Sequence, residues 1–561
     1  MTRFHNPILP GFNPDPSIVR VGDDFYVATS TFEWYPGVQI HHSRDLVNWR
    51  LVARPLCRAG QLDMRGNPDS CGVWAPDLTW ADGRFWLIFT DVKRYGQTTA
   101  DRAVGASLRD FHNYAVTSET IEGPWSDRIH LNSSGFDPAL FHDDDGRSWL
   151  LNMLWDHRPG RGRFAGIVMQ ELDRATMRLV GESRVIFDGT ERGFTEGPHL
   201  YKRDGWYHLL VAEGGTGWDH AVVMARSRSI WGPYEVHPGG AVLTAGGCED
   251  APIARAGHGD LVELDDGSAW LVYLCGRPLP GLGRCVMGRE TAIQPVAWGS
   301  DGWLRTLTED ARPDPAPPLP ALPPHPWPVE PWDGRFTSAE MPAEFQWLRT
   351  PEPEKLFSLT ARPGHLRLWG RESLGSVFEQ SLVARRQEHF CYTATTQVSF
   401  APASFQQSAG LVCYYNGTKF HYLYVTADEG VRQLQVMTAD PAQGCSISVA
   451  VAALPDGPVE LRAEVDHATL RFSWRQEGAE WQTLPGTLNA GMLSDEVTIP
   501  GLPNFTGTFI GMACQDMSGA ALPADFAWFR YEGQPAVQAA SSGVEAASVG
   551  GGAVEERLIS T

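Results

Sequence analysis

The 561-residue sequence lacks the features of a membrane protein or a nucleic-acid-binding protein. No apolar run approaches the ~18–20 residues needed to span a bilayer, and the first residues have no apolar core of a signal peptide. Basic residues are scarce, with 46 Lys and Arg against 67 Asp and Glu, and the net charge is −21. This balance argues against nucleic acids, polyanions and anionic membranes as partners. We therefore expect a soluble, cytoplasmic protein.

Patterned cysteines and helical periodicity are also missing. The nine cysteines show no CxxC or zinc-like spacing, which indicates reduced thiols rather than a disulfide framework. Helical hydrophobic periodicity is scarce throughout, which argues against an α/β fold. The hydrophobic content of 42% is enough for a large core, and the length predicts two or more domains.

A turn followed by an aromatic and aliphatic strand recurs five times in residues 1–312, about every 60 residues. The five turns are Gly22-Asp23, Asp82-Gly83, Asp145-Gly146, Asp204-Gly205 and Asp266-Gly267. Asp-Gly between two strand-like runs signals a hairpin, and the spacing is that of a four-stranded unit with its loops. We therefore predict a five-bladed β-propeller over residues 1–312.

One residue holds the same place ahead of each turn: Asp15, Trp74, Asp137, Glu196 and His258. The last four lie nine residues before their turn glycine, and Asp15 lies eight before Asp23. If the short strands that they begin are innermost, three carboxyl groups, an indole and an imidazole face one channel. Such a group is costly in a core because like charges repel, and it makes sense as a functional site.

Asp15 stands between Pro14 and Pro16. Proline fixes its own φ, and the residue before a proline is pushed toward extended conformations. We therefore expect Asp15 to be a rigid, extended residue. An ordinary Pro-rich turn would look the same when this segment is considered alone.

The second half of the chain has a different composition. Residues 313–331 contain ten prolines and read as a stiff, extended linker. Residues 332–533 alternate short strands and turns, which predicts an antiparallel β-sandwich of the jelly-roll or concanavalin-like type. Residues 534–561 are rich in Ala, Gly, Ser and Val and are expected to be a disordered tail. The predicted fold class is therefore all-β, a propeller followed by a sandwich.

Carboxyl groups in a sugar-sized pocket can cleave a glycosidic bond. One group, protonated, donates to the leaving oxygen, while another, ionised, activates water or attacks directly. A third carboxylate near the acid raises its pKa and keeps it protonated. Asp15, Asp137 and Glu196 supply this number from three different blades.

Three ordered motifs, Asn13-Pro-Asp-Pro-Ser17, Phe136-Asp-Pro-Ala139 and Thr195-Glu-Gly-Pro198, together resemble glycoside hydrolase family 43. The chain is similar to the two-domain β-xylosidases of that family, in which a sandwich follows the propeller. The resemblance extends to about residue 532. It implies an inverting enzyme in which Asp15 is the general base, Glu196 the general acid and Asp137 the residue that tunes the acid and orients the substrate.

The same resemblance implies further site residues. It places Phe32, Trp74 and Arg289 in the xylosyl pocket, and Phe505 on a sandwich loop that closes the pocket. It makes His258 the channel histidine, which contacts either the site directly or a metal through water. No cofactor is expected for the chemistry, and a structural calcium ion in the propeller channel is left open.

The predicted function is that of an inverting, exo-acting glycoside hydrolase that releases xylose from the non-reducing ends of short β-1,4-xylo-oligosaccharides. An α-L-arabinofuranosidase or a bifunctional xylosidase/arabinofuranosidase is the second hypothesis. The same residues would also suit a retaining glycosidase or a non-catalytic carbohydrate-binding propeller. The sequence leaves the oligomeric state open, including a homo-oligomer.

Overall fold

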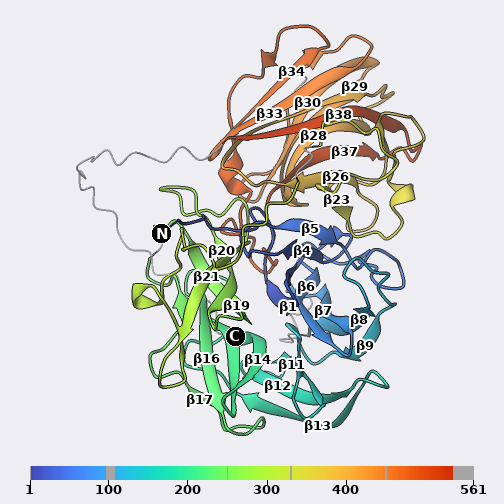
Figure 1. The fold of residues 1–561 in the computed structure, drawn as a ribbon. Helices are drawn as coiled ribbons and strands as arrows, with labels where there is room; N and C mark the ends of the chain where they lie inside the picture. Colours follow the sequence, from blue (N-terminus) through green and yellow to red (C-terminus); the bar gives the residue numbers. More distant parts are fainter. Residues whose placement is uncertain (1, 97–107, 249, 329–331, 449–450, 535–561) are drawn as a thin grey trace, which may run out of the picture.

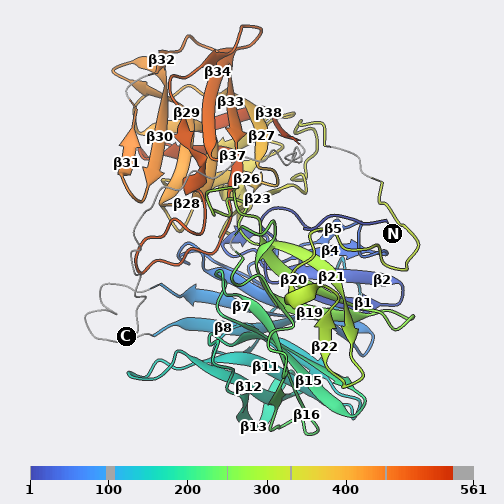
Figure 2. The same cartoon turned by 90° about the vertical axis from the view of Figure 1, so that its left-hand side faces the viewer.

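The computed structural model describes residues 2–96, 108–248, 250–328, 332–448 and 451–534. In these residues the regular structure is almost all β-strand, with three 3₁₀ turns (Glu309–Ala311, Pro353–Lys355 and Ala490–Met492). Figures 1 and 2 show a propeller, coloured blue to green, beneath a sandwich coloured orange to red. The predicted fold class is confirmed. No described helix is long and apolar enough to cross a membrane.

Five antiparallel sheets form the blades of the propeller. The first two blades contain β1 (Ser17–Val21), β2 (Asp24–Thr29), β4 (Gln39–Ser43) and β5 (Arg50–Ala53), then β6 (Gly72–Ala81), β7 (Arg84–Arg94), β8 (Asp110–Ser118) and β9 (Ile129–Asn132). The third contains β10 (Ala139–His142), β11 (Ser148–Trp155), β12 (Phe164–Asp173) and β13 (Arg178–Phe187). The fourth contains β14 (Glu196–Arg203), β15 (Trp206–Glu213), β16 (Ala221–Ser227), β17 (Glu235–Val236) and β18 (Leu243–Thr244), and the fifth β19 (Ala254–Glu263), β20 (Ala269–Gly276), β21 (Glu290–Trp298) and β22 (Leu304–Thr306).

The five repeated turns join the first two strands of each blade, as the sequence predicts. In blade 2, for example, Ala81 pairs with Arg84 across the two-residue turn Asp82-Gly83. Both turn residues have positive φ, 52° and 72°, which is the requirement of the tight turn that Asp-Gly favours. The first strand of each blade, β1, β6, β10, β14 or β19, therefore starts near the residue that the repeat singled out.

Two sheets form the sandwich. The larger contains β3 (Trp34–Tyr35), β23 (Phe345–Leu348), β26 (Ser381–Arg386), β37 (Phe509–Asp516), β28 (Gln407–Asn416), β29 (Lys419–Asp428), β30 (Val431–Asp440), β31 (Gly444–Ile447) and β32 (Ala452–Ala453). The smaller contains β24 (Phe357–Ser358), β25 (Leu366–Trp369), β38 (Pro523–Gln534), β27 (Cys391–Ser399), β33 (Val459–Asp466), β34 (Thr469–Gln476), β35 (Gln482–Thr483) and β36 (Leu488–Asn489).

Strand β3 belongs to the propeller half of the chain but pairs with β23 of the sandwich. Trp34 is fully buried, and its ring stacks on Phe509 of β37 with centroids 3.7 Å apart. One hydrophobic cluster contains Phe12 and Phe32 from the propeller together with Tyr414 and Phe509 from the sandwich. A shared core of this kind fixes the sandwich against the propeller, because separating the two would expose large aromatic side chains.

The Pro-rich segment runs back along the N-terminal residues. The amide of Phe4 donates to the carbonyl of Pro317, and that of Asn6 donates to the carbonyl of Pro315. Within the described residues 313–328 there is no strand or helix, in keeping with an extended linker. The predicted boundaries stay predictions, and residues 329–331 and 535–561 of the predicted linker and tail lie outside the described part of the chain.

Candidate active site

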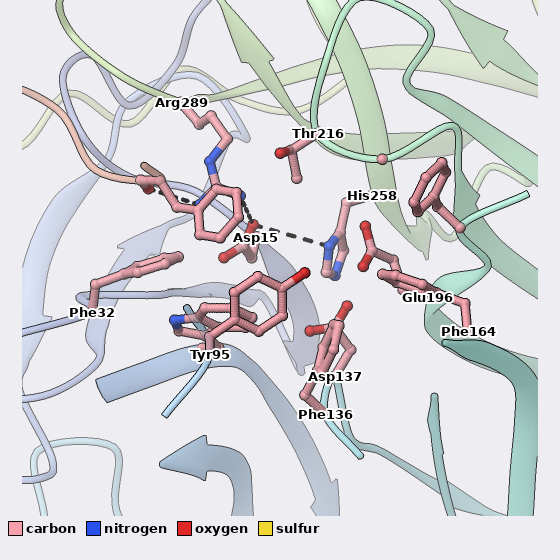
Figure 3. Close-up of a pocket in the computed structure, with 14 residues that line it drawn as sticks. Asp15, Phe32, Tyr95, Phe136, Asp137, Phe164, Glu196, Thr216, His258 and Arg289 are labelled. Atoms are coloured by element: carbon pink, nitrogen blue, oxygen red, sulfur yellow. Dashed lines mark hydrogen bonds and ion pairs between the residues drawn. The ribbon is translucent and has the colours of Figure 1, made fainter. Parts of the chain in front are cut away.

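A cavity of about 190 Å³ lies at the centre of the propeller, where the blades meet a loop of the sandwich. Figure 3 shows the carboxyl groups of Asp15, Asp137 and Glu196 directed into it. The cavity is lined by Asp15, Phe32, Trp74, Tyr95, Phe136, Asp137, Phe164, Phe194, Glu196, Gly215, Thr216, His258, Arg289 and Phe505. The structure therefore brings all eight sequence-predicted site residues to one place.

The backbone conformation of Asp15 differs from the one predicted from the sequence. Its φ is +54°, so the expectation of an extended residue is wrong. The same left-handed conformation recurs in the residue before proline in the next three blades, at Ala75 (36°), Asp137 (54°) and Gly197 (55°). Such a conformation costs on the order of 1–3 kcal/mol in a residue other than glycine. The hydrogen bonds of the blades hold it, because Ser30 donates its amide to the Pro14 carbonyl.

Asp15 is buried and accepts two hydrogen bonds. Nη1 of Arg289 lies 2.8 Å from its Oδ1, and the hydroxyl of Ser30 lies 2.7 Å from its Oδ2. Ser30 Oγ accepts in turn from the amide of Ala75, at 2.7 Å. Contacts of this kind orient a carboxylate.

Glu196 and Asp137 have a different electrostatic environment. Burial raises the pKa of the Glu196 carboxyl well above its ordinary value, and the charges of Asp137 and Asp15 raise it further. Burial also raises the pKa of Asp137, together with the charge of Asp15. The amide of Gly197 donates to Asp137 at 3.1 Å, which favours ionisation of Asp137 over that of Glu196. The site thus combines an ion-paired carboxylate with a carboxyl group whose pKa is raised.

His258 lies between these groups. Burial lowers the pKa of its imidazole to about 4, so the ring is neutral near pH 7. Its Nδ1 is 4.0 Å from Oδ1 of Asp15, and a Cβ on Gly197 would come within 3.0 Å of its Nε2. Calcium takes about six to eight oxygen ligands, some of which can be water, and this position offers an imidazole and a carboxylate that Arg289 already binds. The protein groups alone do not complete a calcium site, and a calcium ion held through water stays a prediction.

Deeper in the channel, Asp77, His199 and Asp260 form one of the groups in the described residues that could hold a metal ion. All three are buried. The carboxylates also accept backbone hydrogen bonds, at 2.7 Å, from the amides of Leu140 and Ile18. Because the blades use these carboxylates to bind each other's strands, we interpret the group as part of the channel's structure.

Phe505 reaches the pocket from the sandwich. Its ring lies edge-on to Trp74, with centroids 5.6 Å apart. Its carbonyl accepts from Nη2 of Arg289 at 2.9 Å, and its amide donates to the hydroxyl of Ser70 at 3.0 Å. One guanidinium therefore connects the Asp15 carboxylate to the sandwich loop.

Six lining residues are not among those predicted from the sequence: Tyr95, Phe136, Phe164, Phe194, Gly215 and Thr216. Two of them could have been found from the sequence by their place beside a predicted carboxyl group, since Phe136 immediately precedes Asp137 and Phe194 stands two residues before Glu196. Tyr95 and Phe164 follow or begin ordinary strands and carry no such signal. The side chain of Phe194 is 56% exposed and lies edge-on to Phe164, so together they form an apolar rim.

A β-propeller whose central pocket joins a carboxyl group of raised pKa to an ion-paired carboxylate has the architecture of a glycoside hydrolase. The chain matches the model of the family described as "Glycosyl hydrolases family 43" over residues 4–304, and that of the "Beta xylosidase C-terminal Concanavalin A-like domain" over residues 334–532. The chain belongs to glycoside hydrolase family 43, and the predicted family is confirmed.

Similar proteins support this assignment over nearly the whole chain. "Xylosidase/arabinosidase 43B" of Humicola insolens is 51% identical, covering 95% of this chain and 98% of that protein. "Beta-xylosidase" of Bacillus subtilis (strain 168) is 46% identical, covering 94% and 99%. The crystal structure of xylan beta-1,4-xylosidase from Bacillus halodurans C-125 is similar with a TM-score of 0.89 and 50% identity, covering 94% of this chain and all of that one.

Proposed function

We propose that the protein is an inverting, exo-acting β-D-xylosidase that releases xylose from the non-reducing ends of short β-1,4-xylo-oligosaccharides. The observation that carries this proposal is the pairing of a buried Glu196, whose pKa is raised, with Asp15, which is held by Arg289, in one sugar-sized cavity. The similar enzymes support xylose as the sugar, since their names are those of xylosidases.

In the proposed mechanism, Asp15 removes a proton from a water molecule that attacks the anomeric carbon. Glu196 gives its proton to the glycosidic oxygen, and the bond from that oxygen to the anomeric carbon breaks. Asp137 keeps Glu196 protonated before the reaction through its negative charge. Arg289 and Ser30 hold the base in place, and the chemistry requires no cofactor.

Exo action is supported by the way in which the sandwich closes the pocket. Phe505 covers one side and is fixed by hydrogen bonds to Arg289 and Ser70, both in the propeller half of the chain. Because Phe505 stands across one side of the pocket, we expect a chain end to enter and an internal segment to be excluded.

Kinetics on 4-nitrophenyl β-D-xylopyranoside and α-L-arabinofuranoside test the choice of sugar. We expect a higher kcat/KM on the xyloside, with measurable turnover of the arabinofuranoside because the two sugars present similar hydroxyl groups. The name of the Humicola insolens relative, which includes both activities, favours a bifunctional enzyme as the second candidate. Negligible turnover of the xyloside would reject the first choice.

The first-formed anomer tests the roles of water and Asp15. Proton NMR during hydrolysis of a β-xyloside is expected to show α-xylose first, followed by slower mutarotation, because inversion places the water on the face opposite to the leaving group. If β-xylose appears first, Asp15 cannot be the base that activates water in a single displacement. A non-catalytic sugar-binding protein would release neither anomer.

The variant Asp137→Asn tests whether Asp137 raises the pKa of the general acid, Glu196. Because the negative charge of Asp137 raises the pKa of Glu196, its removal is expected to lower that pKa. The alkaline limb of the pH profile of kcat/KM, where Glu196 loses its proton, should therefore move to lower pH. Glu191→Gln, an exposed change five residues before Glu196, is the control and should leave the limb in place. An unmoved limb in Asp137→Asn would reject the tuning role.

Three further expectations stay predictions. A structural calcium ion in the propeller channel, held through water near His258, is left open, and no step of the proposed mechanism uses it. The cytoplasmic location is an expectation from the sequence, which leaves the oligomeric state, including a homo-oligomer, open. Cell fractionation and sedimentation of the purified protein are the measurements that test them.

A further inference from the structure

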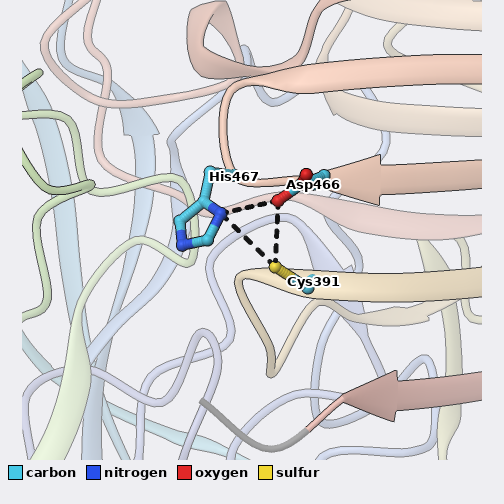
Figure 4. A group of neighbouring side chains, drawn as sticks. All are labelled: Cys391, Asp466 and His467. Atoms are coloured by element: carbon cyan, nitrogen blue, oxygen red, sulfur yellow. Dashed lines mark hydrogen bonds and ion pairs between the residues drawn. The ribbon is translucent and has the colours of Figure 1, made fainter. Parts of the chain in front are cut away.

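A group of three potential metal ligands lies on the sandwich, outside the active site. Figure 4 shows Cys391, Asp466 and His467 directed toward one another. The Sγ of Cys391 is 3.3 Å from Oδ1 of Asp466 and 3.4 Å from Nδ1 of His467, and this nitrogen is 2.7 Å from the same Oδ1. From this geometry, we propose that the group binds a thiophilic divalent cation such as Zn²⁺.

The backbone places the three side chains before any metal binds. Cys391 begins β27 and pairs directly with Asp466, the last residue of β33, so their side chains share one face of the sheet. His467 begins the two-residue turn to β34 with φ +52°, and its amide donates to the Phe390 carbonyl at 3.0 Å. Its ring also stacks on Phe390, with an interplanar angle of 9°. A site fixed in this way loses little conformational entropy on binding.

The donor set matches this class of cation. In tetrahedral zinc sites, Zn–S and Zn–N bonds of about 2.3 and 2.0 Å separate neighbouring ligand atoms by about 3.4–3.6 Å, close to the two distances from sulfur. The 2.7 Å between Nδ1 of His467 and Oδ1 of Asp466 is shorter, so this pair must move apart when the metal binds. One thiolate, one imidazole and one carboxylate favour zinc or a similar transition metal over calcium or magnesium, which prefer oxygen alone. Three protein ligands leave a fourth position for water, and Asp466 and His467 are exposed enough to admit it.

The three side chains form their hydrogen bonds with one another in the described part of the chain. A metal that replaces the shared protons therefore leaves no other polar group unsatisfied. Burial and Asp466 raise the pKa of the Cys391 thiol, so binding must release that proton to solvent. The affinity should consequently increase with pH.

Co²⁺ is a suitable probe because a thiolate ligand gives it an intense near-ultraviolet charge-transfer band. One equivalent added to the reduced, full-length protein is expected to produce this band, and Zn²⁺ should abolish it. Cys391→Ser should lose the band, whereas Cys445→Ser, which changes an exposed cysteine outside the group, should keep it. His467→Ala should weaken binding by more than the roughly 10–100-fold that loss of an outer partner costs.

The proposal is overturned if no band forms, or if Cys391→Ser retains it. A thermal-unfolding curve of each variant without metal shows whether the fold is intact, which is expected because the group lies at the surface. As a second readout, Zn²⁺ should raise the unfolding temperature of the parent protein and of Cys445→Ser but not that of Cys391→Ser. Equal shifts in all three would also reject the site.

A second inference concerns Lys419, a buried lysine at the start of β29. Its Nζ donates to the carbonyls of Ser494 and Val497, at 2.6 and 3.0 Å, and to Oδ1 of Asn504, at 2.5 Å. These acceptors belong to the two ends of the loop that carries Phe505 into the active site. We infer that Lys419 is a positioning residue, which ties both ends of this loop to β29 and so sets the position of Phe505.

Other contacts connect Lys419, through the loop that carries Phe505, to the Asp15 carboxylate. Tyr415, whose ring lies 3.6 Å from the Lys419 nitrogen, donates to Asp495 at 2.6 Å and accepts from the amide of Thr506 at 3.1 Å. The residue between these anchors, Phe505, binds Arg289, which in turn binds the Asp15 carboxylate. A shift of the loop would therefore disturb both the pocket wall and the partner of the base.

Lys419→Met keeps the length of the side chain and removes its donors. Because displacing a pocket wall by about 1 Å can cost 10²-fold in rate, we expect kcat/KM on xylobiose to fall about 10–100-fold, mainly through KM. Lys355→Met, on an exposed lysine in a surface ion pair, is the matched control and should change neither constant.

The decisive measurement is a double-mutant cycle with Phe505→Ala. If Lys419 acts through Phe505, its replacement should have little further effect once that ring is gone, so the two losses should not add. Additive losses would overturn the inference and indicate a general effect on the fold. Should Lys419→Met fail to fold, Asn504→Ala removes the acceptor on the loop side and is subject to the same test.

Discussion

Glu196→Gln is expected to reduce kcat on xylobiose by about 10³–10⁴-fold, near the upper end of what a general acid contributes. Gln has the shape of Glu but carries no proton that it can give to the glycosidic oxygen. An aryl xyloside with a good leaving group needs little protonation, so the loss there should be within about tenfold. Steady-state kinetics on both substrates measure this difference between leaving groups.

Glu191→Gln provides the matched control, since it makes the same substitution at an exposed position of the same segment. Its kinetics should equal those of the parent enzyme. Isothermal titration should show that Glu196→Gln still binds xylobiose. Equal losses of kcat on both substrates would contradict the assignment of Glu196 as the acid.

The same substitution should change the dependence of stability on pH. The raised pKa of Glu196 means that the fold favours its protonated form, a contribution that is fully present below the ordinary value of 4.5 and is lost as pH rises through the raised value. Gln does not ionise. We therefore expect Glu196→Gln to unfold at a higher temperature than the parent at alkaline pH, with a smaller difference at acidic pH.

Asp15→Asn is expected to lower kcat by about 10²–10⁴-fold on every substrate, whatever its leaving group. The amide cannot accept the proton of the attacking water, and this step is required however readily the other bond breaks. The substitution also leaves Arg289 without its carboxylate partner. Kinetics on xylobiose and on aryl xylosides of increasing leaving-group quality give the comparison.

A comparison with Ser30→Ala separates chemistry from positioning. Ser30 donates to the same carboxylate, so its loss should weaken orientation of the base and reduce kcat much less than Asp15→Asn. If a better leaving group restores the activity of Asp15→Asn as it does that of Glu196→Gln, the two roles are assigned the wrong way round. The contrast between the two variants is therefore more informative than either loss alone.

The blades and their turns could be predicted because they depend on residues that are close together in the sequence. Asp-Gly turns such as Asp82-Gly83 recur in register and specify where each blade begins, since the tight turn needs positive φ at both residues. This register also brought Asp15, Asp137 and Glu196 to one cavity. The conformation of Asp15 could not be predicted in the same way, because non-local hydrogen bonds such as that from the Ser30 amide to the Pro14 carbonyl override the preference of a residue before proline.

The sequence by itself determined the all-β architecture, the five-fold repeat, the family and the three carboxyl groups, because these depend on spacing and on residue type. Only the tertiary structure decided which of those groups is ion-paired and which have a raised pKa, since burial and neighbouring charge are not local properties. It also decided that Tyr95 and Phe164 line the pocket and that Arg289 connects the base to Phe505 of the sandwich. Segments more than 200 residues apart meet at that guanidinium, as the separation of 216 residues between Arg289 and Phe505 shows, and no local pattern specifies such a contact.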